Sequence, residues 1–196
     1  MQLKMKTALL ALFLSTTIFA QEESNNSLDK KHEIKVDAIE LIVVANIEIT
    51  YEYLISKYSG AGISITFDGG NSSDDFLNWA ITPFYRQYFF NRQEKRAQGL
   101  FAEGHLNLGS FENDYYQYTY DTDTGFIVDE RFVEHDKTAF GAGFALGYKW
   151  ASNNGFVIEP SVGVGRNIIG NTQDDGAYYD SIDFYFRGGI QVGYRF

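Results

Sequence analysis

Ten ionisable side chains share one face of a series of alternating segments, and they are the residues that could perform chemistry. Because side chains alternate across a β-strand, residues two apart lie on the same face. The polar face carries Glu48, Glu52, Arg86, Glu103, His105, Lys149, Glu159, Asp183, Arg187 and Arg195. Buried charges are costly unless they pair or contact water. The pattern predicts an ion-pair network packed as a polar plug in a barrel lumen, with a gated pore or proton path as the alternative.

A second group of acidic residues is a weak candidate for a metal site. Asp121, Asp123 and Asp129 are spaced somewhat as in a calcium-binding loop. The EF-hand needs Gly at its sixth position and Glu at its twelfth. Here those positions hold Phe126 and Phe132. We therefore expect a solvated acidic loop, with no bound metal and no other cofactor.

The histidines offer one further candidate for catalysis. Membrane-barrel acyltransferases and lipases use a histidine with a serine on the outer rim of the barrel. His135 and Asp136 fall near the predicted outer rim, but no serine motif accompanies them. Glu48 and Glu52 do not by themselves make a catalytic pair either. We expect a non-enzymatic protein, and a membrane-barrel enzyme acting on lipid is the alternative.

The elements that position these residues are strands. Alternating segments span residues 33–44, 46–55, 61–67, 78–90, 99–111, 138–150, 156–167 and 181–196. The first segment changes phase, which predicts a bulge near Ala38. Pro83 has no N–H to donate, so the fourth needs a bulge or a local gap. An even number of amphipathic strands predicts an all-β fold, an eight-stranded antiparallel transmembrane barrel of the outer-membrane type.

The last segment carries the clearest alternation. Its apolar face runs from Ile182 to Phe196, and it is longer than the roughly 5–6 residues usual in a globular strand. Its length suits a tilted membrane-spanning strand. Tyr194 and Phe196 resemble the aromatic ending of outer-membrane barrels, so we expect them to form the closing-strand signal that the barrel-insertion machinery reads.

The connections between the segments alternate in length. Those after the second, fourth and sixth segments are short, whereas those after the third, fifth and seventh are mostly longer and acidic; the connection near Ala45 breaks the rule. Outer-membrane barrels have short periplasmic turns and long outer loops. The longest connection, 112–137, is acidic and contains Tyr115, Tyr116, Tyr118 and Tyr120, which could bind a partner or pack onto the rim.

Composition sets the class of protein. The chain has 196 residues, no Cys, and a formal charge of −10, which becomes −12 when Lys4 and Lys6 leave with a leader. Such acidity disfavours nucleic acid as a partner. A basic start, an apolar run and a small residue at Ala20 predict a cleaved signal peptide over 1–20. A polar lead-in over 21–32 and a barrel domain over 33–196 follow.

Three stretches resemble one known family. The segments 34–55, 82–89 and 99–105 are similar to those of the DUF3575 family, exported Bacteroidetes proteins of unassigned function that form small outer-membrane barrels. The resemblance implies the barrel fold and the outer-membrane location, and it brings no catalytic residues.

The sequence as a whole predicts an outer-membrane barrel of a Gram-negative bacterium with a structural or surface-interaction role through 112–137. Its expected partners are outer-membrane lipid and, during assembly, the insertion machinery; the sequence names no extracellular partner. A soluble exported ligand-binding barrel is a further alternative.

Overall fold

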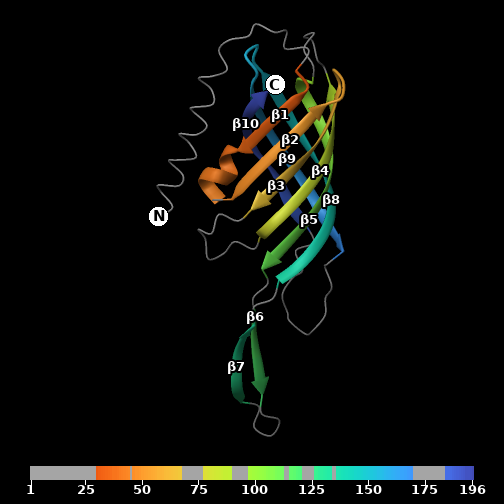
Figure 1. The fold of residues 1–196 in the computed structure, drawn as a ribbon. Coiled ribbons are helices and arrows are strands. Elements are labelled where there is room, and N and C mark those ends of the chain that lie inside the picture. The colour runs from red at the N-terminus through yellow and green to blue at the C-terminus, as the bar shows by residue number, and fades with distance from the viewer. Residues whose placement is uncertain are drawn as a thin grey trace.

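A computed structural model of the chain shows a closed antiparallel β-barrel (Figure 1). It describes residues 30–44, 46–67, 77–89, 97–112, 115–120, 126–133, 136–169 and 184–196. The barrel strands are β1 (His32–Asp37), β2 (Ile47–Leu54), β3 (Ser59–Phe67), β4 (Leu77–Phe89), β5 (Gly99–Glu112), β8 (Asp136–Ala151), β9 (Phe156–Ile169) and β10 (Phe184–Arg195). The prediction of an eight-stranded antiparallel barrel is confirmed. The predicted signal peptide lies outside the described residues.

The barrel closes between its first and last strands. The order around it is β1-β10-β9-β8-β5-β4-β3-β2. Glu33 pairs with Arg195 and Asp37 with Gln191 in the β1–β10 ladder. Beyond the ladder, the His32 N–H donates to the Phe196 carbonyl (3.1 Å) and the Phe196 N–H donates back (2.8 Å). The sheet therefore has no free edge within the barrel, which removes the usual hazard of unpaired strands.

The barrel is apolar outside and charged inside. On β2, burial alternates along the strand, with Glu48, Thr50 and Glu52 buried and Ile49 and Tyr51 exposed. Each of the eight barrel strands exposes at least one large apolar side chain, and Phe144 on β8 and Phe186 on β10 are 62% and 68% exposed. A water-soluble protein buries its apolar side chains, and this barrel exposes them. The arrangement follows from the alternation of apolar and polar residues in the sequence, because a closed sheet places every second side chain in the lumen.

The first strand is shorter than predicted. β1 ends at Asp37, and a π-helical segment, η1 (Glu40–Val44), follows it. The Asp37 Oδ1 atom accepts hydrogen bonds from the N–H groups of Ile39 (2.8 Å) and Glu40 (3.0 Å), which turns the chain out of the sheet. The prediction of one strand over 33–44 with a bulge near Ala38 is therefore wrong, because the change of phase marks a helical turn.

The ladder between β4 and β5 is interrupted at Pro83. Pairing runs to Ile81 opposite Leu108 and resumes at Phe84 opposite His105 without a change of register. On its other side, Pro83 still pairs with Ile63 of β3. The interruption is thus the local gap that a missing N–H requires, and no residue is inserted there.

The stretch 112–137 is not simply a loop. Two of its segments, β6 (Tyr115–Tyr120) and β7 (Ile127–Val133), pair in an antiparallel ribbon. The flanking strands β5 and β8 also pair as far as Glu112 opposite Asp136. The ribbon extends away from the barrel, at the end opposite the C-terminus (Figure 1). The prediction of a long acidic loop over 112–137 is therefore wrong for β6 and β7.

Short turns gather at the other end of the barrel. The β2–β3 and β8–β9 connections take four residues each, 55–58 and 152–155, whereas most of the predicted loops 68–75 and 168–180 lies outside the described residues. Tyr148, Trp150 and Phe196 are exposed at the turn end, and Phe67 and Phe184 at the ribbon end. Among the described residues, no helix is both long and apolar enough to cross a membrane.

Candidate functional site in the barrel lumen

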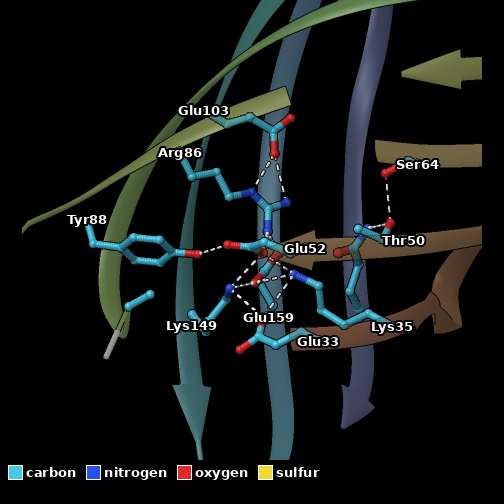
Figure 2. Close-up of polar contacts among 12 residues, drawn as sticks. Glu33, Lys35, Thr50, Glu52, Ser64, Arg86, Tyr88, Glu103, Lys149 and Glu159 are labelled. Carbon is cyan, nitrogen blue, oxygen red and sulfur yellow. Dashed lines mark hydrogen bonds and ion pairs between the residues drawn. The ribbon is translucent and has the colours of Figure 1, made fainter. Parts of the chain in front are cut away.

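Glu52 on β2 is the centre of the lumen network. Its Oε2 atom accepts from the Nζ atoms of Lys35 on β1 and Lys149 on β8 and from Nη1 of Arg86 on β4, each at 2.7 Å. Its Oε1 atom accepts from the hydroxyl of Tyr88, also on β4, at 2.6 Å. Figure 2 shows these side chains converging from different strands. One carboxylate therefore ties together β1, β2, β4 and β8.

Three carboxylates share two ammonium groups. The Lys149 Nζ atom lies 2.7 Å from Glu33, 2.7 Å from Glu52 and 3.2 Å from Glu159. The Lys35 Nζ atom contacts the same three residues, at 3.6, 2.7 and 3.0 Å. All five side chains are fully buried. Oxygens of the three glutamates lie within 4.8 Å of one another, close enough to hold a metal ion. The two lysines already supply the positive charge that a metal would bring.

Arg86 and Arg195 extend this cluster in both directions. Arg86 contacts Glu159 through Nη1 (2.6 Å) and Glu103 through Nη2 (2.7 Å). Arg195, at the turn end, contacts Glu33 (2.6 Å) and donates to the backbone carbonyl of Ala97 (3.0 Å). The Arg86 guanidinium also lies over an aromatic ring, 4.6 Å from the centroid of Phe101. Arginine suits such a position because its planar head can pair and stack at once.

A second layer lies nearer the ribbon end. Arg187 on β10 donates from Nε to Glu103 (3.0 Å) and from Nη1 to Glu48 (3.1 Å). Gln191 donates to the other oxygen of Glu48 at 2.7 Å. This layer is less enclosed, since the Arg187 side chain keeps 12% of its surface exposed. The lumen is therefore densest in its turn-side half.

The charges of the network balance. Its carboxylates are Glu33, Glu48, Glu52, Glu103 and Glu159, and its cations are Lys35, Arg86, Lys149, Arg187 and Arg195. Each of these ten side chains has a partner of opposite charge within 3.2 Å. A buried ionic network is tolerable only when its members are paired in this way. The network is thus built to fill the lumen.

Small residues on β8 and β9 make room for the large side chains. A Cβ added to Gly147 would collide with the ring of Phe101, and one added to Gly143 would collide with Nε2 of His105. Gly143 pairs with Gly165 of β9, so no side chain from these two positions projects into the lumen. The inward glycines of the sequence therefore serve packing, because eight strands enclose space for side chains and little else.

The turn end of the lumen is closed by an apolar cluster. Leu54, Tyr88, Ala97 and Phe101 contact one another and are all at most 1% exposed. The Ala97 N–H donates to the Lys57 carbonyl (3.0 Å), which holds the end of the β4–β5 connection across the β2–β3 turn. The cluster and the ion pairs beneath it are buried and fill this half of the lumen.

His105 lies at the boundary between the two halves. Its Nδ1 atom is 3.2 Å from Glu103, yet neither ring nitrogen makes a well-directed hydrogen bond within the described part of the chain. The ring faces Tyr185, with centroids 5.8 Å apart. His32 lies elsewhere, at the turn end, with Nδ1 2.7 Å from the Tyr51 hydroxyl. Neither described histidine is arranged with a serine as a general base would be.

One acidic residue at the ribbon end was not predicted. Glu40 of η1 lies outside the barrel strands, and burial together with the nearby carboxylates of Glu48 and Asp37 raises its pKa to about 8, which Arg187 partly offsets. Its Oε2 atom is buried and has no hydrogen-bond partner among the described residues. This is the environment of a carboxyl group that takes up a proton near neutral pH.

The structure brings together most of the residues predicted for the lumen. Glu48, Glu52, Arg86, Glu103, His105, Lys149, Glu159, Arg187 and Arg195 all point inward, whereas Asp183 lies outside the described residues. Asp121, Asp123 and His135 also lie outside them, and Asp129 is exposed on β7, remote from the lumen. Sequence reasoning missed Glu33, Lys35, Tyr88 and Gln191. Glu33 and Lys35 obey the same alternation, opposite Ile34 and Val36, and could have been found from it.

The comparisons with known proteins identify the family of the chain. The family model for "Protein of unknown function (DUF3575)" matches residues 7–180. The chain belongs to the DUF3575 family. The resemblance seen in the sequence is thereby confirmed, while a Bacteroidetes origin stays a prediction. A solved structure, the N-terminal β-barrel domain of Pseudomonas aeruginosa OprF, is similar at 11% identity and a TM-score of 0.48, covering 88% of this chain and 100% of that one. A comparison with curated proteins gave no match.

Proposed function

We propose that this DUF3575 member is a non-enzymatic outer-membrane barrel with a closed lumen, which holds its β6–β7 ribbon at the cell surface as an interaction surface. The observation that carries the proposal is the inverted distribution of side chains. Lys149 and its carboxylate partners are fully buried, whereas the neighbouring Tyr148 and Trp150 are about half exposed. A contiguous apolar surface around a whole barrel is stable in lipid and aggregates in water.

The orientation follows from the two ends of the barrel. Short turns and the apolar cluster of Leu54, Tyr88, Ala97 and Phe101 occupy one end, and the ribbon occupies the other. In outer-membrane barrels the short turns face the periplasm. The ribbon accordingly faces outward.

The closed lumen argues against transport through the barrel. Arg86, Glu52 and Glu159 fill the centre and are at most 1% exposed, and their charges are mutually satisfied. A conducting pore needs a water-filled path lined by groups that hold an ion only weakly. The balanced ion pairs instead make the barrel a stiff support.

The ribbon has the properties of a binding element. Phe126 and Ile127, at its tip, are 74% and 54% exposed, and Tyr118 on β6 is also exposed. Apart from their mutual ladder, β6 and β7 form no further sheet pairing within the described residues. A free two-stranded ribbon is only marginally stable alone and offers edges to which another chain can add. The stretch 112–137 carries eight acidic residues against two basic ones, so a cationic partner is favoured.

The proposal is tested by fractionation and surface proteolysis. We expect the protein in the outer-membrane fraction, with a gel mobility that shifts on boiling because the barrel resists unheated detergent. A protease added to intact cells should cut within 113–135 and leave both flanking barrel fragments protected. Recovery in the soluble periplasmic fraction without detergent would instead indicate a soluble exported barrel, and a ribbon cut only after cell lysis would reverse the orientation.

A further inference from the structure

The geometry points to a lipid-binding notch in the outer wall of the barrel, between β4 and β5, that holds one acyl chain of a phospholipid. The notch is an open recess of about 460 Å³, lined on its outer side by Pro83, Tyr85, Gly104 and Leu106 and at its base by Phe84, His105 and Gly143. Sites for small apolar ligands have volumes of about 300–1,000 Å³. The inference rests on the proposed membrane location and is independent of the ribbon.

The backbone explains why the notch occurs here. Pro83 cannot donate to the ladder, and β4–β5 pairing is interrupted beside it, between Ile81 and Phe84. Gly104 faces outward directly opposite Tyr85, and a Cβ added to it would meet no atom within 4 Å. By contrast, a Cβ added to an inward-facing glycine such as Gly143 or Gly147 would collide with a neighbouring side chain. Gly104 is thus a gap in the side-chain cover of the barrel wall.

The surroundings select an acyl chain as the occupant. Tyr85 and Leu106 form the sides of the notch and are 49% and 46% exposed, so both present apolar surface to it. The notch is continuous with the apolar outer face of the neighbouring strands, which includes Ile63 on β3 and Phe144 on β8. The accessible lining is mainly apolar, so a hydrocarbon chain can fill such a recess while desolvating little polar surface.

Two polar side chains lie at one end of the notch. Tyr85 and Gln87 lie on the same outward face, and the Tyr85 hydroxyl donates to Gln87 Oε1 at 3.4 Å. Both lie toward the turn end of β4, which finishes at Phe89. Tyrosines are enriched where the apolar membrane meets the headgroups. The lipid is therefore placed with its headgroup near Gln87 and its chain running toward Pro83, in the leaflet on the turn side.

The test uses the full-length protein in phospholipid vesicles that contain a phospholipid with a photoactivatable diazirine midway along one acyl chain. After illumination, crosslinks are mapped by mass spectrometry. We expect several-fold more crosslinking at Pro83–Tyr85 and Gly104–Leu106 than at Val162 and Val164, which face lipid on β9. Gly104→Leu should fill the notch and reduce that excess to the level of β9. Val162→Leu is the matched control and should leave it unchanged.

Three outcomes would overturn the inference. Equal labelling of the notch and β9 in the unmodified protein shows that no chain is held, although the barrel is still in the bilayer. Loss of the notch labelling as the protein-to-lipid ratio is raised shows that a second copy occupies the notch. Absence of labelling on every strand contradicts the membrane location itself, and so the proposed function. If Gly104→Leu does not fold, Leu106→Ala replaces it, because removing one side of the notch should also lower the excess.

Discussion

Lys149 and Glu52 lie 97 positions apart in the chain, yet the Lys149 Nζ atom donates to Glu52 Oε2 at 2.7 Å and neither side chain is exposed. The two residues come from β8 and β2, which are not neighbours in the sheet. Their contact therefore crosses the lumen. Neither charge can reach water. Removing one of them therefore leaves the other buried and unpaired, and the protein loses the full free energy needed to bury that charge.

Lys149→Met should destabilise the barrel strongly. The change keeps much of the side-chain volume but leaves three buried glutamates with one ammonium fewer, and breaking a buried pair in this way costs about 3–5 kcal/mol. Urea unfolding in detergent micelles, followed by gel mobility or tryptophan fluorescence, measures the loss. Tyr148→Phe, one residue away on the lipid face, is the control. Equal midpoints for the two variants would show that the ion pairs contribute nothing to stability.

Arg187→Ile should have a smaller effect, of about 1–3 kcal/mol, because both carboxylates that it contacts keep other donors. Glu103 retains Arg86, and Glu48 retains Gln191. Ile190→Leu on the lipid face should change the unfolding midpoint very little. The predicted order of damage is Lys149→Met, Arg187→Ile, Ile190→Leu. A barrel in which Ile190→Leu is the most harmful of the three would contradict the inside–outside assignment.

Glu40 should make stability depend on pH. Its pKa in the folded protein is raised to about 8, above that of an unfolded glutamate. A carboxyl with a raised folded-state pKa stabilises the fold below its unfolded pKa, and this contribution is lost as the pH rises through the folded-state value. The free energy of unfolding should therefore fall between about pH 5 and about pH 9. Glu40→Gln should flatten the curve, and an unchanged slope in that variant would exclude Glu40 as the cause.

The barrel should fold without the ribbon. Replacing 113–135 by a short Gly-Ser turn keeps every β5–β8 pair up to Glu112 opposite Asp136. Heat-modifiable mobility should remain, since the hydrogen-bond ladder closes around the barrel without β6 and β7. Binding of cationic peptides to whole cells should be lost. Failure of the shortened chain to reach its folded form would make the ribbon structural and remove it as the interaction surface.

Alternation of side chains made most of the lumen predictable from the sequence. Because the period of a strand is two, placing Glu52 inward also places Glu48 and Thr50 inward, and no tertiary information is needed. The same rule assigned Arg187 and Arg195 to the interior. Periodicity could not predict which charged side chains pair with one another. The contact of Lys35 with Glu159, 124 positions away, depends on barrel closure and stagger.

Two local features escaped prediction for specific reasons. The turn after β1 depends on Asp37 accepting from Ile39 and Glu40, and the apolar run of η1 reads equally well as a strand. The ribbon escaped because β6, with the sequence YYQYTY, is short and lies in a strongly acidic stretch, which outweighed the alternation of Tyr116, Tyr118 and Tyr120 with polar residues.

The closure between β1 and β10 has a consequence for the order of folding. Lys35 and Glu33 enter the cluster from β1, and Arg195 enters from β10, so the charges meet only when the first and last strands do. Before the first and last strands pair, some of these charged side chains would lie in an apolar environment without a partner of opposite charge. Partly closed barrels are therefore very high in free energy. The same free-energy barrier slows both the closure of the barrel and its opening. Once the His32 and Phe196 backbones are hydrogen-bonded, the lifetime of the closed barrel is set by its slow rate of opening.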